Sequence, residues 1–444
     1  MVNSFPYLLL CLFAGILFII VATARWRIPA FFALLAACFI VGLAVKMPLA
    51  NILTSIKEGF GNIMKSLGLI IVMGTTLGAV LEHNGSITVL SEFIIRKLGR
   101  KYIALSMNII GFIVGMPVFC DSGYIILSSL NRSIAQRTGR SIYVTSISLA
   151  TGLLSVHCLI PPHPGASAAA ALFELDLGKL LVAGLLIAIP VSLLGYFWTC
   201  FAGKNQDVLN ETEPFVPKEQ QSQPSVLQSI APIVIPVILM AAKSFSSLKT
   251  SNDGTWHQLF GALGEPVIAL ALGIFLALLF WKKKNLSSMS QLLAEGAEKA
   301  GGILVIIGAG GSFGAVLTAM HFGEHFSRSL PLETMGILFP FLTTLLLKTA
   351  QGSSTVAIIT ASSLVLPLLP ALHLDSANGR LLAVLSMASG SMIISHANDA
   401  YFWVISRFSS LALRPMFRIY TLATLWMGLF SFTLVYLLSL FLPH

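Results

Sequence analysis

The sequence carries little charge. Asp, Glu, Lys and Arg make up 10% of its 444 residues, whereas a typical soluble domain contains about 25%. Hydrophobic residues make up 56%, which is more than a soluble chain of this length can bury. The apolar stretches do not alternate with polar residues, so a transmembrane β-barrel is excluded. The composition therefore predicts an all-α polytopic membrane protein.

The sequence also lacks the motifs of several other protein classes. Its five cysteines form no C-x-x-C pair, so we expect neither a disulfide framework nor a metal site. The H-E-x-x-H motif is absent, which disfavours the alternative of an intramembrane enzyme built on His157, His163 and Asp399. No nucleic-acid-binding motif accompanies the net charge of +9, and positive charge is typical of the cytoplasmic loops of membrane proteins. We therefore expect a lipid bilayer as partner, and no nucleic acid, no cofactor and no enzymatic activity.

What the sequence does contain is a repeat of its own first half. Apolar runs of about 20 residues, the length that crosses a bilayer, occur throughout. Residues 74–81 (Gly-Thr-Thr-Leu-Gly-Ala-Val-Leu) return as 310–317 (Gly-Gly-Ser-Phe-Gly-Ala-Val-Leu), and 150–152 (Ala-Thr-Gly) return as 388–390 (Ala-Ser-Gly). Because the spacing between copies is nearly constant, the whole half is repeated. Such duplication is typical of secondary transporters.

We predict two repeats, residues 1–202 and 227–444, joined by a cytoplasmic linker over 203–226. Each repeat is expected to hold about five transmembrane helices, one re-entrant hairpin and one helix broken at the bilayer midplane. The hairpins are predicted at about 101–131 and 335–369, and the broken helices at about 142–172 and 380–405. An odd number of crossings in each half makes the two repeats inverted. The distribution of Lys and Arg places the N-terminus outside.

Four polar breaks interrupt these apolar segments. They fall at the hairpin tips, 115–123 and 351–355, and in the broken helices, 157–165 and 395–399. Irregular backbone at membrane depth is tolerated only inside protein or beside a water-filled cavity. The free amide groups at the N-terminal ends of broken helices attract anions. We therefore predict a site for a small polar anion at the midplane, where the repeats meet.

The residues expected to contact the substrate lie in these breaks. They are Asp121, Ser122, His163, Pro164, Gly165, Gln351, Gly352, Ser353, Ser354, Thr355 and Asn398. Lys348 has two interpretations: it neutralises a substrate carboxylate, or it extends along its own stem to the outer surface. Histidines beside a break are more often structural than ligands, which applies to His157 and His163. Glu82 lies near a predicted helix end and is expected to be solvated.

Proton coupling requires a group that titrates within the membrane. Asp121 is costly in an apolar hairpin unless it is paired or protonatable, so it is predicted to carry a proton or contact the substrate; the alternative is a cap on the hairpin turn. His396 and Asp399 face the same side if the helix resumes there, and a neighbouring imidazole and carboxylate titrate together. The alternative is that both side chains satisfy the broken backbone.

The breaks also resemble the signatures of a known family. Residues 117–123 (Pro-Val-Phe-Cys-Asp-Ser-Gly), 161–165 (Pro-Pro-His-Pro-Gly), 351–357 (Gln-Gly-Ser-Ser-Thr-Val-Ala) and 395–403 (Ser-His-Ala-Asn-Asp-Ala-Tyr-Phe-Trp) are similar to those of the gluconate permeases, part of the ion transporter superfamily. The resemblance implies a homodimeric symporter of the bacterial inner membrane with an elevator motion. Its members take up gluconate, idonate, fructuronate, glycerate or D-serine with the proton gradient. This chain departs from the family at Ala166, at Asp121 and over 400–401, which leaves the substrate open.

The hypothesis from the sequence is a proton-coupled importer of a small hydroxy-acid or sugar-acid anion such as gluconate. Sodium coupling, as in related dicarboxylate carriers, remains an alternative because hydroxyl-rich hairpin tips can also coordinate sodium. A carrier for D-serine or glycerate is another alternative, and a channel would conduct without accumulating substrate.

Overall fold

The computed structural model describes residues 5–204, 224–246, 261–281, 286–320, 334–396 and 399–442. Within these ranges the chain is helical and contains no strand. Most of the predicted linker over 203–226 lies outside the described residues, and so does Asn398.

The first half contains nine α-helices among its described residues. They are α1 (Phe5–Ile20), α2 (Ala30–Ala44), α3 (Leu49–His83), α4 (Ser86–Leu98), α5 (Ile103–Gly115), α6 (Cys120–Thr138), α7 (Ile142–Leu159), α8 (Pro164–Leu172) and α9 (Leu177–Ala202). The second half contains α10 (Val226–Ser246), α12 (Pro266–Leu279), α13 (Leu286–Ala319), α15 (Leu338–Gln351), α16 (Ser354–Val365), α17 (Ala377–Met392), α18 (Ala400–Phe408), α19 (Leu413–Met416) and α20 (Leu422–Ser439).

The two halves use the same order of elements. A long helix (α3 or α13) precedes a pair of short helices (α5–α6 or α15–α16), a broken helix (α7–α8 or α17–α18) and a long final helix (α9 or α20). In each half the first helix of the short pair packs on the first part of the broken helix, α5 on α7 and α15 on α17. The inverted orientation of the two halves in a membrane stays a prediction.

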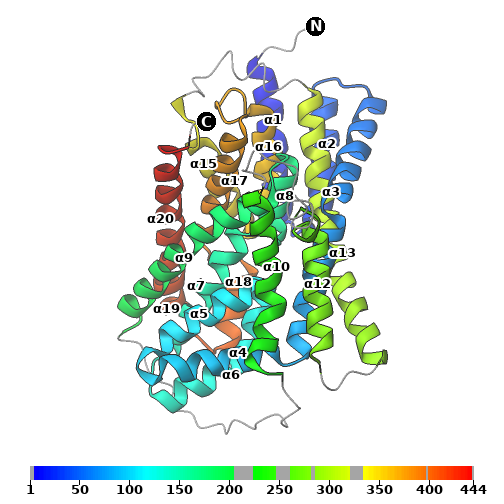
Figure 1. Cartoon of the computed structure of the whole chain (residues 1–444). Helices are drawn as coiled ribbons and strands as arrows, with labels where there is room; N and C mark the ends of the chain where they lie inside the picture. Colours follow the sequence, from blue (N-terminus) through cyan, green and yellow to red (C-terminus); the bar gives the residue numbers. More distant parts are fainter. Residues whose placement is uncertain are drawn as a thin grey trace.

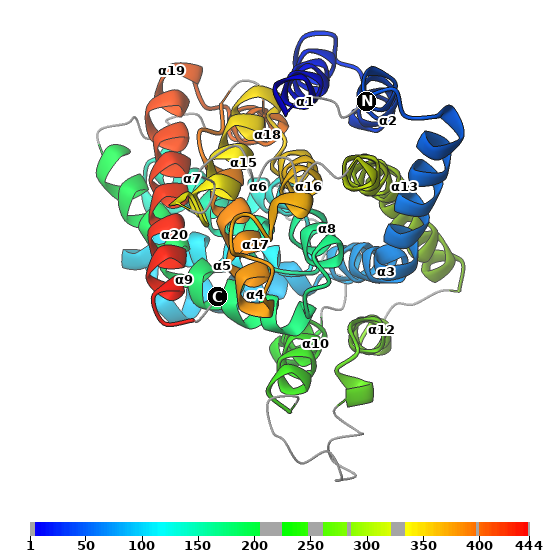
Figure 2. The ribbon, with the colours of Figure 1, turned by 90° about the horizontal axis from the view of Figure 1, so that it is seen from above.

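The helices form two groups with α8 and α16 between them. Seen from above, α9 and α20 lie at one edge and α2 and α3 at the other (Figure 2). The helix α8 contacts α3 and α16, and α16 contacts α13. The two chain ends lie at one end of the molecule, and α4 and α6 lie at the opposite end (Figure 1). The breaks between helices are thereby brought into the middle of the fold.

The long helices α3 and α13 cross at glycines. A Cβ added at Gly59 would lie 2.4 Å from the carbonyl oxygen of Gly311, so only a residue without a side chain fits there. The helix α3 also bends by 48° between Lys65 and Gly68. Close approach of this kind supplies van der Waals contact, which stabilises helix pairs in a membrane where lipid is as apolar as leucine.

The repeated Ala-Thr-Gly and Ala-Ser-Gly motifs serve this close packing. A Cβ at Gly152 on α7 would lie 2.2 Å from the carbonyl oxygen of Asn108 on α5. Its counterpart Gly390 on α17 would meet the carbonyl oxygen of Phe341 on α15 at 2.4 Å. Each motif therefore lets a broken helix lie directly against the backbone of the neighbouring short helix.

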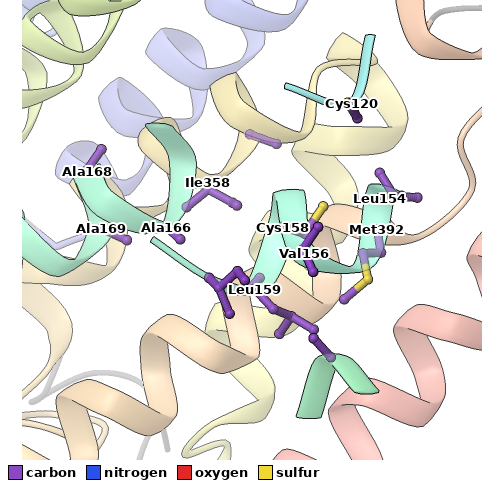
Figure 3. Close-up of a cluster of buried hydrophobic side chains, with 14 of the residues drawn as sticks. Cys120, Leu154, Val156, Cys158, Leu159, Ala166, Ala168, Ala169, Ile358 and Met392 are labelled. Carbon is purple, nitrogen blue, oxygen red and sulfur yellow. The ribbon is translucent and has the colours of Figure 1, made fainter. Parts of the chain in front are cut away.

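The core around the broken helices is apolar and tightly buried. Leu154, Val156 and Cys158 on α7 lie beside Met392 of α17 (Figure 3), and each is at most 2% exposed. Alanines of α8 and Ile358 of α16 extend the same cluster. This packing holds the polar breaks in place.

Five helices in the described part of the chain are long and apolar enough to span a membrane, or six if the bent α3 counts as one span. They are Ile142–Leu172, Leu177–Ala202, Val226–Lys243, Met289–Ala319 and Leu413–Ser439. Several other apolar helices are shorter, including Ile103–Gly115 and Pro266–Leu279. The larger number of ten spanning helices stays a prediction, because breaks divide several apolar stretches into short helices.

Candidate functional site

Four helices begin at one cavity. Its volume is about 450 Å³, within the range of about 300–1,000 Å³ that is usual for small-molecule sites. The lining comprises Phe119–Ser122 at the start of α6, Pro164 of α8, Ser353–Val356 at the start of α16, Asp399–Tyr401 at the start of α18, Gln351, Leu154 and His157, and Ile303 and Ile306 of α13. The backbone N–H groups of a first helical turn have no partner within the helix. Four such ends around one cavity create a positive field suited to an anion.

The local sequence explains why helices begin there. The Ser353 hydroxyl accepts a hydrogen bond from the backbone N–H of Val356, at 3.3 Å, and caps α16. The Asp399 carboxylate accepts one from the backbone N–H of Tyr401, at 3.0 Å, and caps α18. Pro164 is the first residue of α8, where its missing N–H costs nothing. Ser and Asp are preferred caps because their side-chain oxygens accept hydrogen bonds from the free N–H groups of the first turn.

Gly352 ends α15 in a left-handed conformation, with φ of +85°. A side chain at this angle would be strained. The turn separates Gln351, the last residue of α15, from Ser354, the first of α16, by only two residues. Gly352 therefore acts through backbone conformation, and it does not line the cavity.

Asp121, which the sequence predicts to contact the substrate or carry a proton, lines the cavity. It is the second residue of α6. Its carboxylate Oδ1 lies 3.8 Å from the Cys120 thiol, and no ion pair to it occurs among the described residues. Asp121 is therefore the carboxylate of the cavity that lacks a neutralising cation in this part of the chain.

Lys348 and Asp399 form a buried ion pair. Lys348 Nζ lies 2.6 Å from Asp399 Oδ2, and the two residues are 1% and 6% exposed. Lys348 also donates to the carbonyl oxygen of Gly352, and the Ser395 hydroxyl donates to Asp399. The interpretation that Lys348 extends to the surface is therefore wrong. Lys348 does not line the cavity either, because its ammonium group is directed to Asp399.

His396 contacts Asp399 through the backbone. Its carbonyl oxygen accepts a hydrogen bond from the Asp399 N–H at 2.8 Å. The Asp399 carboxylate is instead bonded to Lys348, Ser395 and the N–H of Tyr401. Within the described residues, no side-chain contact joins His396 to Asp399, so the predicted imidazole–carboxylate coupling stays a prediction.

His163 is directed away from the cavity. It is 2% exposed, and its Nε2–H donates to the carbonyl oxygen of Gly115 at 2.6 Å. This bond ties the start of α8 to the end of α5. Gly165 packs on α16, because a Cβ there would lie 3.3 Å from the Cα of Thr355. Both predicted contact residues thus shape the site from behind its lining.

His157 lines the cavity although sequence reasoning favoured a structural role for it. Its Nε2 lies 3.4 Å from the Thr355 hydroxyl oxygen. Its Nδ1 is buried and has no hydrogen-bond partner in the described part of the chain. A histidine in the last turn of an apolar helix, just before a break, is the sequence signal that identifies it.

Gln351 presents an unsatisfied amide to the same cavity. Both its Oε1 and its Nε2 are buried without a hydrogen-bond partner among the described residues. Leaving buried polar groups unpaired costs about 1–3 kcal/mol each, a cost that a bound polar ligand removes. By contrast, the Ser354 hydroxyl already donates to the carbonyl oxygen of Ser391, at 2.8 Å.

One wall of the cavity is apolar. Ile303 and Ile306 of α13 form it, and sequence reasoning did not identify them because they lie in an uninterrupted apolar helix. The site is therefore a polar surface built from the breaks, facing an apolar surface of α13.

Comparisons with known proteins agree with this architecture. Residues 7–441 match the family described as GntP family permease. The chain is 32% identical to a gluconate permease of Pseudomonas aeruginosa, over 98% of each chain. It is 29% identical to the D-serine transporter DsdX of Escherichia coli K12, over 96% of this chain and 97% of that protein. The crystal structure of the Alcanivorax borkumensis YdaH transporter has the same fold, with a TM-score of 0.64 and 16% identity over 88% of this chain and 89% of that chain.

These matches span nearly the whole chain in sequence and in structure. The chain therefore belongs to the GntP permease family, and it is a multi-pass transporter of the bacterial inner membrane and not an enzyme.

Proposed function

We propose that this protein imports a small hydroxy-acid or sugar-acid anion, such as gluconate, together with a proton. The observation that carries the proposal is the convergence on one cavity of four helix N-termini and the Asp121 carboxylate, which forms no ion pair among the described residues. A relative named gluconate permease that matches over 98% of the chain supports this substrate class.

The substrate carboxylate binds the amide groups at the starts of α16 and α8, where the helix ends are positive. Its hydroxyl groups meet the Gln351 amide, whose Oε1 and Nε2 have no hydrogen-bond partner in the described structure, and the His157 imidazole, whose Nδ1 has none. A polyhydroxylated acid fits this combination because it carries one anionic end and several groups that both donate and accept hydrogen bonds.

The proposed coupling of substrate binding to proton binding follows from the charges around the cavity. Lys348 and Asp399 neutralise each other, which leaves the negative charge of Asp121. Two like charges about 4 Å apart repel by about 4 kcal/mol at the effective dielectric constant of protein sites. Protonation of Asp121 removes this repulsion. The anion and the proton therefore bind together, and a bare charge does not have to cross an apolar barrier.

We propose that the transport movement occurs between the polar and the apolar sides of the cavity. The hairpins and broken helices, which hold the polar residues, move as a body against α3 and α13, in an elevator motion within a homodimer. The apolar wall formed by Ile303 and Ile306 supports this division, since these side chains offer no hydrogen bond to the moving body. Further along α13, the Ser363 hydroxyl of α16 donates to the Gly310 carbonyl oxygen at 2.6 Å, and movement would have to break this bond.

Import of a zwitterion such as D-serine is a second candidate. The Asp121 carboxylate favours it, because it lines the cavity without an ion-pair partner among the described residues and, when ionised, would bind the ammonium group of the substrate directly. A relative at 29% identity is named a D-serine transporter.

Uptake by purified protein in proteoliposomes tests the proposal. We expect labelled gluconate to accumulate when the interior is alkaline, with or without sodium, and to stop accumulating when the pH gradient is collapsed. Accumulation that requires sodium would overturn proton coupling. Accumulation of D-serine without gluconate would replace the first substrate class by the second.

A further inference from the structure

A much smaller cavity adjoins the central one at the tip of the α5–α6 hairpin. Its volume is about 10 Å³. Phe119 and Ser122 line both cavities, so the two are neighbours at the start of α6. We refer to the small cavity as the passage. Glu82 of α3 and Lys299 of α13 line its other walls.

One face of α13 runs along both cavities. Lys299 lines the passage, and Ile303 and Ile306 line the central cavity. Residues at spacings of four and three share a helix face, so the passage and the central cavity are consecutive along α13. The passage therefore leads from the polar site toward the charged residues at the end of the helix pair α3–α13.

The size of the passage determines what can use it. A cavity needs about 10–15 Å³ of this kind of volume to hold one water molecule. A hydroxy acid cannot pass, whereas a proton can move between a water molecule and the Ser122 hydroxyl, which both donates and accepts hydrogen bonds. Ser122 is adjacent in sequence to Asp121, which faces the central cavity.

Glu82 stands where this path reaches solvent. Its side chain is 28% exposed, and its carboxylate lies 3.9 Å from Lys299 Nζ. Lys299 is closer to Glu295 on its own helix, at 2.8 Å, and His83 Nε2 lies 3.9 Å from Glu295. Two carboxylates thus share one ammonium group. Glu82 is the more loosely held of the two. The sequence-based view of Glu82 as a merely solvated residue is therefore incomplete.

We propose that Glu82 is the residue through which the coupling proton is exchanged with the solution at the α4 end of the molecule. The proton leaves the Asp121 carboxyl group, moves through the Ser122 hydroxyl and one water molecule in the passage, and binds the Glu82 carboxylate before it enters solvent. The substrate leaves by a separate, wider route. The inference rests on the proposed proton coupling and adds the path of the proton.

The test separates net transport from exchange, using the purified full-length chain in proteoliposomes with labelled gluconate as probe. Net uptake driven by a pH gradient requires proton release in every cycle. Exchange of internal for external gluconate at equal pH does not. We expect Glu82→Gln to slow net uptake and the accompanying internal acidification by at least about a hundredfold, since a positioned proton-transfer group typically contributes about 10²–10⁴-fold. Exchange should be unchanged, and Glu82→Asp, which keeps a carboxylate, should restore most of the net uptake.

Glu295→Gln is the matched control. It removes the same charge from the same group of side chains, but Glu295 does not line the passage, so net uptake should stay at the wild-type rate. Normal proton-coupled uptake in Glu82→Gln would overturn the inference and leave the proposed function intact. Loss of exchange in that variant would also overturn it, since Glu82 would then act in folding or conformational change. A wild-type protein that moves gluconate without a proton would overturn the proposed coupling itself.

Discussion

Lys348 Nζ lies 2.6 Å from the Asp399 carboxylate, and both residues are almost completely buried. The bond joins the end of α15 to the cap of α18. In the first half of the chain, His163 makes the corresponding connection, since it precedes α8 and donates to the Gly115 carbonyl at the end of α5. In both halves of the chain, the start of the second part of the broken helix is thus tied to the end of the first helix of the short pair. The connection is an ion pair between α18 and α15 and a neutral hydrogen bond between α8 and α5.

Removing the cation of this pair should destabilise the protein strongly. Lys348→Met leaves the Asp399 carboxylate buried and unpaired, which typically costs about 3–5 kcal/mol. We expect a clearly lower unfolding temperature in detergent. The double variant Lys348→Met/Asp399→Asn should recover much of the loss, because Asn also caps helices. A single variant as stable as wild type would show that the pair does not hold the two elements together.

Asp121→Asn should uncouple transport from the pH gradient. The amide carries no titratable proton, so gluconate accumulation should fall to the level seen without a gradient, while exchange across the membrane persists. Asp121→Glu, which keeps a titratable carboxyl group, is the control and should retain coupled uptake. Full gradient-driven accumulation in Asp121→Asn would remove Asp121 from the coupling mechanism.

Gln351→Leu should weaken substrate binding without lowering the stability of the protein. Losing a hydrogen bond to a substrate hydroxyl costs about 0.5–1.5 kcal/mol, which raises the KM for gluconate by up to about tenfold. The protein without substrate should be at least as stable as wild type, because the substitution removes two unsatisfied polar atoms. Measurements of uptake at several gluconate concentrations and of thermal unfolding check both expectations. An unchanged KM would show that the amide does not contact the substrate.

Gly78→Ala should disturb the contact between α3 and the tip of the first hairpin. The added Cβ would lie 2.8 Å from the carbonyl oxygen of Pro117, and relieving such overpacking costs about 1–3 kcal/mol. We expect lower thermal stability and slower uptake. Gly61→Ala on the same helix is the control, since its Cβ meets nothing within 4 Å and Ala is favoured over Gly in helices by about 1 kcal/mol. Equal behaviour of both variants would mean that the tip is not held against α3.

The sequence by itself determined the membrane class, the repeat and the positions of the breaks, because these depend on local chemistry. A run of apolar residues specifies a buried helix, and Pro, Gly or a capping Ser or Asp ends or begins one within a few residues. Asp121, Gln351 and Ser353 were identifiable in this way, since they are polar residues at such ends.

The tertiary structure alone decided which polar groups meet. Lys348 and Asp399 are 51 residues apart, and nothing local to either specifies the other. Likewise, helix packing directs His157 into the cavity and His163 away from it. It also places Ile303 on the cavity wall and Glu82 at the passage. Which side chains become partners in a helix bundle depends on how helices that are distant in sequence approach one another. That approach depends on glycines such as Gly152 and Gly390, which pack directly against the backbone of another helix.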